Sequence, residues 1–220
     1  KGSFEICAFD KVDRHVEAES LGVIFASFEE CASSDIVVFA VPISSLRESL
    51  EKAVGFLKPG AIVFDVCSVK EFPVGAMAEL VPEHCECIGT HPLFGPETAK
   101  NGLQGQKIVL CPVRTKRLEK IVSFFESLGL EVIVSGAEEH DRNMAHSLSL
   151  VHFLGKGLIG IGADKVEFAT RTHEMFLELM NIVRKDSKEL FEDMHKFNRF
   201  ASPTRKKMVE ELERLDRGLD

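Results

Sequence analysis

A regular alternation of short apolar runs with helical patterns constrains the fold of this 220-residue chain more than any other feature. Continuously apolar strands of this kind are buried on both faces of a sheet, which is typical of largely parallel sheets covered by helices. Helical spacing recurs between the runs, as at Leu46, Leu50, Ala53 and Leu57. The sequence therefore predicts a doubly wound α/β domain whose strands occupy residues 4–9, 22–25, 35–41, 61–66, 86–89, 108–111 and 131–134.

The strand pattern stops near residue 138, and four helical segments follow it to the end of the chain. The first of them, residues 144–161, is apolar nearly all round, so we expect it to be buried in a helical domain or at a subunit interface. The natural boundary is the Ser135-Gly136-Ala137 stretch. We therefore expect an α/β domain over residues 1–136 and an all-helical domain over residues 137–220.

Composition and charge exclude several classes of partner. The net charge of −8 argues against nucleic acid or an anionic membrane as the main partner. No apolar run approaches the roughly 20 residues of a membrane span, and no leader opens the chain. The cysteines lie mostly within or beside apolar runs: Cys7, Cys31, Cys67, Cys85, Cys87 and Cys111. They lack the spacing of a disulfide framework or a zinc site, which indicates reduced thiols, a cytoplasmic protein and no metal.

Polar residues follow two of the apolar runs, where each run ends. His91 lies beyond the run 86–89, in a Gly/Pro-rich turn where packing does not call for an imidazole, and Ser68 follows the run 61–66. In α/β sheets, ligands bind outside the carboxyl ends of the strands, so we expect both residues to line one cleft, with His91 as a catalytic base. The alternatives are a solvent-exposed turn histidine and a helix-capping serine.

Asp10 ends the first apolar run and suits the recognition of a ribose diol. In dinucleotide-binding folds such a carboxylate accepts hydrogen bonds from the ribose hydroxyls and repels a 2′-phosphate, which favours NAD over NADP. The glycine-rich phosphate loop normally lies about 20 residues before this acid, and only nine residues precede Asp10. We therefore expect a strand and a glycine loop upstream of Lys1. The alternatives are that Asp10 merely caps a helix, or that the domain binds no nucleotide.

The order of these features resembles the NAD(P)-dependent prephenate/arogenate dehydrogenases of tyrosine biosynthesis. The resemblance rests on Asp10, on Ala40-Val41-Pro42, on Asp65 to Lys70, on Gly89 to Glu97, and on His140 to Phe153 at the start of the helical part. It implies a Rossmann-type dinucleotide-binding domain followed by a helical dimerisation domain, and thus a homodimer. It also implies NAD at Asp10, Val41, Pro42 and Ser68.

The resemblance implies oxidation of the ring 4-hydroxyl of prephenate, transfer of hydride to nicotinamide and loss of carbon dioxide. By that analogy His91 takes the hydroxyl proton, and Ser68 binds the same hydroxyl and helps to hold His91 in the right tautomer. Glu97 and His152 match family positions near the substrate side chain. A histidine on an apolar helix, such as His152, is otherwise a satisfied core or interface residue.

The chain departs from the family where an arginine normally grips a substrate carboxylate. The expected arginine falls at Asn181 or Ile182. Arg184 lies three residues after Asn181 on the same helix face, and Arg171 lies at the start of the helix, so both are candidate carboxylate ligands. Each is otherwise a solvated surface charge.

Two other functions remain open at this stage. A dehydrogenase of the β-hydroxyacid type would need a lysine base in the helical part, where Lys156 is the well-placed candidate. A non-catalytic, dimeric ligand-sensing module would account for the missing phosphate loop and the absent arginine. The sequence does not distinguish prephenate from arogenate.

Overall fold

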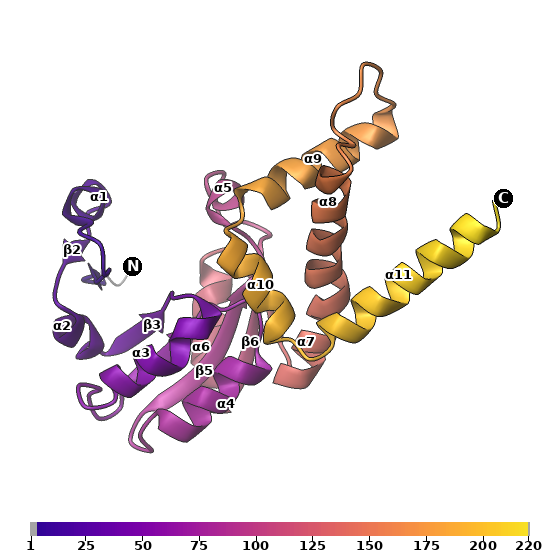
Figure 1. Cartoon of the computed structure of the whole chain (residues 1–220). Coiled ribbons are helices and arrows are strands. Elements are labelled where there is room, and N and C mark those ends of the chain that lie inside the picture. Colours follow the sequence, from indigo (N-terminus) through magenta and orange to yellow (C-terminus); the bar gives the residue numbers. More distant parts are fainter. Residues whose placement is uncertain (1–3, 220) are drawn as a thin grey trace.

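The computed structural model describes residues 4–219, with the side chains of Pro96 and Glu97 left out. Its centre is a five-stranded sheet in the order β3-β4-β5-β6-β7 (Figure 1). β3, β4 and β5 run parallel, β6 runs antiparallel to β5, and β7 pairs in parallel with β6. The bounds are β3 (Ile36–Phe39), β4 (Ile62–Asp65), β5 (Glu86–Pro92), β6 (Lys107–Arg114) and β7 (Glu131–Val134). The predicted mostly parallel α/β sheet is confirmed.

The antiparallel β5–β6 ladder corrects the prediction that His91 lies in a turn. His91 pairs with Val109 and Pro92 with Ile108, so β5 continues three residues past the predicted end at residue 89. His91 is consequently a buried strand residue, with 7% of its surface exposed. Its imidazole is packed inside the protein, whereas the sequence predicted a ring that plays no part in packing. Beyond β5 the chain forms α5 (Pro96–Ala99) and returns to β6.

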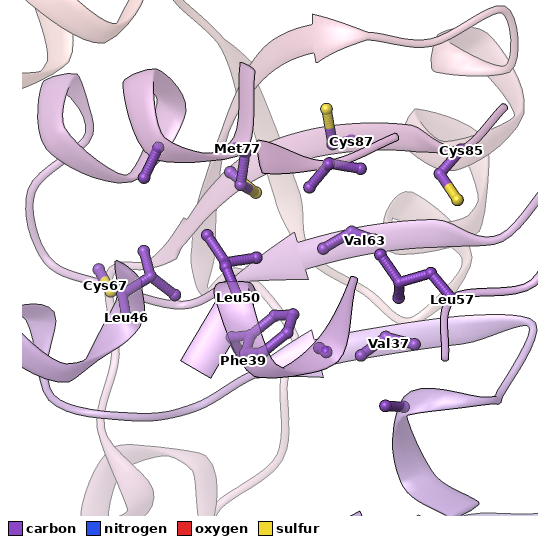
Figure 2. Packing of buried hydrophobic residues seen from close by; sticks show 14 of the residues in the cluster. Val37, Phe39, Leu46, Leu50, Leu57, Val63, Cys67, Met77, Cys85 and Cys87 are labelled. Carbon is purple, nitrogen blue, oxygen red and sulfur yellow. The ribbon is translucent and has the colours of Figure 1, made fainter. Parts of the chain in front are cut away.

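Helices cover both faces of the sheet because alternate strand residues point to opposite sides. On one face, α3 (Leu46–Ala53) and α4 (Glu71–Leu80) pack on the strands. Figure 2 shows this core, which includes Val37, Phe39, Val63 and Cys87 from the strands and Leu46, Leu50 and Met77 from the helices. On the other face, α6 (Leu118–Ser127) covers Ile62, Phe64, Ile88, Ile108 and Leu110.

The first two strands form a separate small sheet. β1 (Cys7–Ala8) pairs in parallel with β2 (Ile24–Phe25), and α1 (His15–Ser20) and α2 (Phe28–Ala32) flank them. β1 is shorter than the predicted strand at 4–9. Gly22 follows α1 with a φ of 68°, a left-handed conformation that commonly ends helices. Within residues 4–219, β1 and β2 form no ladder with β3. The strand expected upstream of Lys1 stays a prediction.

The rest of the chain is helical, as predicted. It comprises α7 (Ala137–Met144), a π-helical turn (Ala145–Ser149), α8 (Leu150–Gly160), α9 (Arg171–Lys185), α10 (Lys188–Lys196) and α11 (Ala201–Arg217). In Figure 1, α8 and α9 rise away from the sheet and α11 projects outward. Across residues 4–219 no helix combines the length and the apolar character that crossing a bilayer requires. The division at residues 136 and 137 stays a prediction.

Polar contacts seat the helical part on the sheet. A 3-10 turn (Ile43–Ser45) follows β3, and its Ser44 N donates to Asp193 Oδ2 of α10 at 2.9 Å. Arg199 forms an ion pair with Glu71 of α4 at 2.9 Å. Within the helical part, Asn198 Nδ2 donates to the Asp141 carbonyl of α7 at 2.7 Å, which ties α7 to the segment between α10 and α11. These contacts hold α7 and α10 at the carboxyl end of the parallel strands.

Candidate active site

The register of three parallel strands brings the predicted strand-end residues to one edge of the sheet. Phe39 pairs with Asp65 and Asp65 pairs with Gly89, so the carboxyl ends of β3 and β4 lie level with Gly89, and β5 continues three residues beyond them. Val41 and Pro42 follow β3, Ser68 follows β4, and His91 lies two residues beyond Gly89. The cleft expected from the sequence would lie at this edge, where α/β sheets bind ligands, and it stays a prediction.

His91 is joined to two residues that the sequence interpretation gave no role. Its Nδ1 atom lies 2.8 Å from His140 Nε2, and His140 Nδ1 lies 2.8 Å from Asp141 Oδ1. All three side chains are buried. The two imidazoles and the carboxylate are therefore linked across β5 and α7, where His91 and His140 lie 49 residues apart in the chain. The sequence does contain the adjacent pair His140-Asp141. That this pair is buried and faces His91 becomes apparent only when the position of α7 is known.

Asp141 also fixes the loop that carries Ser68. Its Oδ1 atom accepts a hydrogen bond from Lys70 N at 2.6 Å, and its Oδ2 atom accepts one from Glu71 N at 2.9 Å. These amides lie at the amino end of α4, where backbone N–H groups lack helical partners and favour a carboxylate. One carboxylate thus ties the loop after β4 to the histidine pair.

A buried ion pair lies beneath the site. Lys70 Nζ contacts Asp65 Oδ2 and donates to the Thr90 carbonyl oxygen at 2.5 Å, and neither charged side chain is exposed. Asp65 Oδ1 accepts from Thr90 N at 3.1 Å. These bonds hold the residue that directly precedes His91. Gly89 is required here, because a Cβ atom would lie 2.8 Å from the Val74 side chain.

The environment of His91 favours the neutral imidazole. Burial lowers the pKa of His91 well below 6.5, and the neighbouring His140 and Lys70 lower it further. A charged imidazole is poorly solvated here and lies close to the Lys70 ammonium. At pH 7 His91 is therefore unprotonated, which is the form that a general base needs.

The remaining strand-end candidates are placed as follows. Ser68 Oγ is buried and has no hydrogen-bond partner among the described residues, so it does not hold His91 as the resemblance implied and its hydroxyl is available to a ligand. Val41 packs on the sheet core, and Pro42 begins the 3-10 turn. Asp10 is exposed on the small β1–β2 sheet, where its Oδ1 atom accepts from Val12 N at 2.8 Å. The structure thus groups Val41, Pro42, Ser68 and His91 but leaves Asp10 on the other sheet.

Two predicted residues of the helical part lie in a second cluster. His152 is buried on α8, and its Nδ1 atom lies 2.8 Å from Asp186 Oδ2. Burial lowers the pKa of His152 in spite of that carboxylate. Lys156, the alternative base, lies one turn along α8 with its Nζ atom 5.8 Å from the centre of the Phe191 ring. Glu97 lies in α5, and its side chain is outside the described part of the structure.

The two arginines proposed as carboxylate ligands are exposed on α9. Arg184 forms an ion pair with Asp164 at 2.5 Å, and Arg171 is the first residue of the helix. Asn181 and Ile182, where the family arginine was expected, are also exposed. Neither arginine contacts His91 within the described residues, so their proposed role requires a ligand that reaches α9.

Comparison with known proteins identifies the family. Residues 3–134 match the model of the nucleotide-binding domain of prephenate dehydrogenase. The chain belongs to the prephenate/arogenate dehydrogenase family. The resemblance drawn from the strand-end residues is therefore confirmed. Residues 158–220 match a second model, the TYRAAT1-like C-terminal domain, which covers α9, α10 and α11.

The relatives that match this chain include proteins named for arogenate and proteins named for prephenate. It is 33% identical to a probable arogenate/prephenate dehydrogenase of Methanocaldococcus jannaschii, over 84% of this chain and 44% of that protein. It is 31% identical to arogenate dehydrogenase 2 of Arabidopsis thaliana, over 84% of this chain and 52% of that protein. The chain thus spans about half the length of these relatives.

Solved structures share the fold. The crystal structure of Aquifex aeolicus prephenate dehydrogenase, in complex with hydroxyphenyl propionate and NAD⁺, superposes with a TM-score of 0.79 and 21% identity. The match covers 98% of this chain and 81% of that one. It therefore includes both the sheet and the helical part.

Proposed function

We propose that this protein catalyses the NAD-dependent oxidative decarboxylation of prephenate to 4-hydroxyphenylpyruvate. The observation that carries the proposal is the buried, neutral His91 at the carboxyl end of β5, hydrogen-bonded through Nδ1 to His140. Membership of the prephenate/arogenate dehydrogenase family supports the assignment of the substrate class.

In this proposal His91 takes the proton of the ring hydroxyl as that oxygen becomes a carbonyl. The O–H bond breaks, its electron pair forms the carbonyl π bond, and the hydrogen on the ring carbon leaves as hydride. Ser68 Oγ, buried and without a hydrogen-bond partner in the described part of the chain, binds the same oxygen and orients it. The loss of carbon dioxide follows, because the ring then becomes aromatic. Glu97 and His152 are proposed to lie near the substrate side chain.

The residues present fit NAD as the cofactor. NAD supplies the hydride acceptor when it is bound. The exposed Asp10 carboxylate suits the ribose hydroxyls. Val41, Pro42 and the Ser68 hydroxyl, which has no partner within the described residues, lie at the edge of the sheet that α/β folds use for ligands. The match of residues 3–134 to a nucleotide-binding domain supports this placement.

The decisive experiment measures NADH formation and carbon dioxide release from the full-length protein with prephenate, with arogenate and with small β-hydroxyacids. Turnover of prephenate with stoichiometric carbon dioxide supports the proposal. A preference for arogenate would reassign the substrate within the family. Turnover of β-hydroxyacids alone, or NAD binding without any turnover, would contradict the proposal.

Removal of the α9 arginine that binds the substrate carboxylate should weaken substrate binding. Prephenate carries two carboxylates, and truncating a guanidinium that binds one of them costs about 2 to 5 kcal/mol of binding free energy. We expect Arg184→Ala or Arg171→Ala to raise the KM for prephenate, whereas Arg214→Ala on α11 should not. If both α9 variants keep KM within about twofold, the cation comes from elsewhere or the substrate is wrong.

We also propose that the protein is a homodimer built through its helical part. Large apolar side chains are exposed around α8 and α9, among them Ile161 (80%), Phe168 (87%) and Met175 (67%). Such a surface is expected to be covered by a partner. Light scattering should give a dimer at micromolar concentration, and Phe168→Asp with Met175→Asp should shift it toward monomer while Val16→Asp on α1 does not. A monomeric wild type would contradict this proposal.

A further inference from the structure

The histidine behind the catalytic base carries a further inference. We propose that His140 and Asp141 act as a positioning pair for His91. The pair leaves the Nε2 atom of His91 free to take the substrate proton, and His140 accepts the proton that His91 then releases from Nδ1. The proposal rests on the proposed dehydrogenase function for its kinetic consequences. Its structural part, the tautomer of His91, rests on the hydrogen-bond geometry together with a neutral His140 in the resting protein.

The tautomer follows from the chain of hydrogen bonds. A carboxylate only accepts hydrogen bonds, so the 2.8 Å contact between Asp141 Oδ1 and His140 Nδ1 places a hydrogen on that nitrogen. With neutral rings, His140 Nε2 is then bare and can only accept. The 2.8 Å contact with His91 Nδ1 therefore places a hydrogen on His91 Nδ1 and leaves His91 Nε2 with its lone pair.

Asp141 itself is held firmly enough to impose this order. Its two oxygens also accept from Lys70 N and Glu71 N, and its backbone carbonyl accepts from Asn198 Nδ2. The side chain is fully buried, so no water competes for the contact with His140. The carboxylate is therefore fixed in position at the end of the relay.

The same pair provides a place for the proton. When His91 Nε2 gains the substrate hydroxyl proton, the Nδ1 proton of His91 can pass to His140 Nε2, so His91 stays neutral and His140 becomes an imidazolium beside Asp141. One proton enters the pair and none leaves it. The positive charge comes to lie next to a carboxylate, whereas on His91 it would face the nearby Lys70 charge. The attraction to Asp141 and the greater distance from the Lys70 charge both favour the transition state for deprotonation of the hydroxyl.

The tautomer is tested by the ¹⁵N NMR signals of the His91 ring in the full-length protein without cofactor, near pH 8. We expect a protonated, pyrrole-type Nδ1 and an unprotonated, pyridine-type Nε2. In His140→Leu the partner of Nδ1 is lost and a mixture of tautomers should appear, whereas His140→Gln offers an amide oxygen and should preserve the wild-type signals. A pyridine-type Nδ1 in the wild type, or no change in His140→Leu, would overturn the proposal.

Kinetics separate positioning from proton acceptance. Neither Gln nor Leu at position 140 can accept a proton, but only Gln can hold Nδ1–H. We expect kcat to fall about tenfold in His140→Gln and about a hundredfold or more in His140→Leu, with KM for substrate and cofactor within about twofold in both. Equal losses in the two variants, or changes in KM alone, would overturn the relay. Thermal unfolding of both variants establishes that they fold.

Failure of this proposal is distinguishable from failure of the proposed function. If the protein oxidises none of the substrates offered, the NMR experiment still decides whether His140 sets the tautomer of His91. If it oxidises prephenate with the opposite tautomer, the proposed function survives and the positioning pair does not.

Discussion

Replacement of His91 by Asn should lower kcat at least about a hundredfold while the KM for NAD stays within about twofold. The lost imidazole acts on the hydroxyl proton and makes no contact that the dinucleotide needs, and positioned general bases contribute about 10²- to 10⁴-fold. The measurement is the steady-state rate of NADH formation with prephenate at saturating NAD. His91 is buried, so bulk water has little access to the position of the ring.

The matched control is His84→Asn, an exposed histidine before β5, which should leave the rate unchanged. Because Asn is shorter than His and His91 is buried, the variant must also be shown to fold, by comparing its thermal unfolding with that of the wild type. A folded His91→Asn protein with near-normal turnover would remove His91 from the mechanism and with it the proposed function.

The strand-end residues were predictable because sheet periodicity is local. The apolar run before Ser68 and the run before His91 each mark a buried strand, and parallel neighbours place their carboxyl ends at one edge. The extent of β5 was not predictable in this way. His91 and Pro92 pair with Val109 and Ile108 of an antiparallel neighbour, and nothing in the run 86–89 specifies the direction of that neighbour.

The partners of His91 were missed for a different reason. The contact between His91 and His140 joins positions 49 residues apart, and it exists only because α7 packs against the loop after β4, where Asp141 caps α4. Local pattern gives the helix but not the side of the sheet on which it docks. The same limit applies to Arg184, whose ion pair with Asp164 depends on how the loop between α8 and α9 folds back.

Removal of the Lys70 charge should destabilise the protein more than any surface substitution. Lys70 and Asp65 are both fully buried and contact each other, so Lys70→Met leaves a buried carboxylate without its counter-charge. Breaking a buried pair by removing one partner typically costs about 3 to 5 kcal/mol. We expect a loss of that size in the free energy of unfolding, measured by urea denaturation. The Thr90 carbonyl oxygen also loses its donor, which adds to the loss.

Two further variants separate charge from packing. Lys52→Met breaks the exposed ion pair with Glu48 on α3, and exposed pairs contribute at most about 1 kcal/mol, so its stability should be close to that of the wild type. In the double variant Asp65→Asn with Lys70→Met neither of these two positions carries a charge. The amide oxygen at position 65 can still accept from one of the two backbone donors, Thr90 N or Cys67 N, that bind the two carboxylate oxygens of Asp65. The double variant should therefore be more stable than Lys70→Met alone. If it is less stable, the cost of Lys70→Met comes from packing, and the ion pair is not what holds Thr90 beside His91.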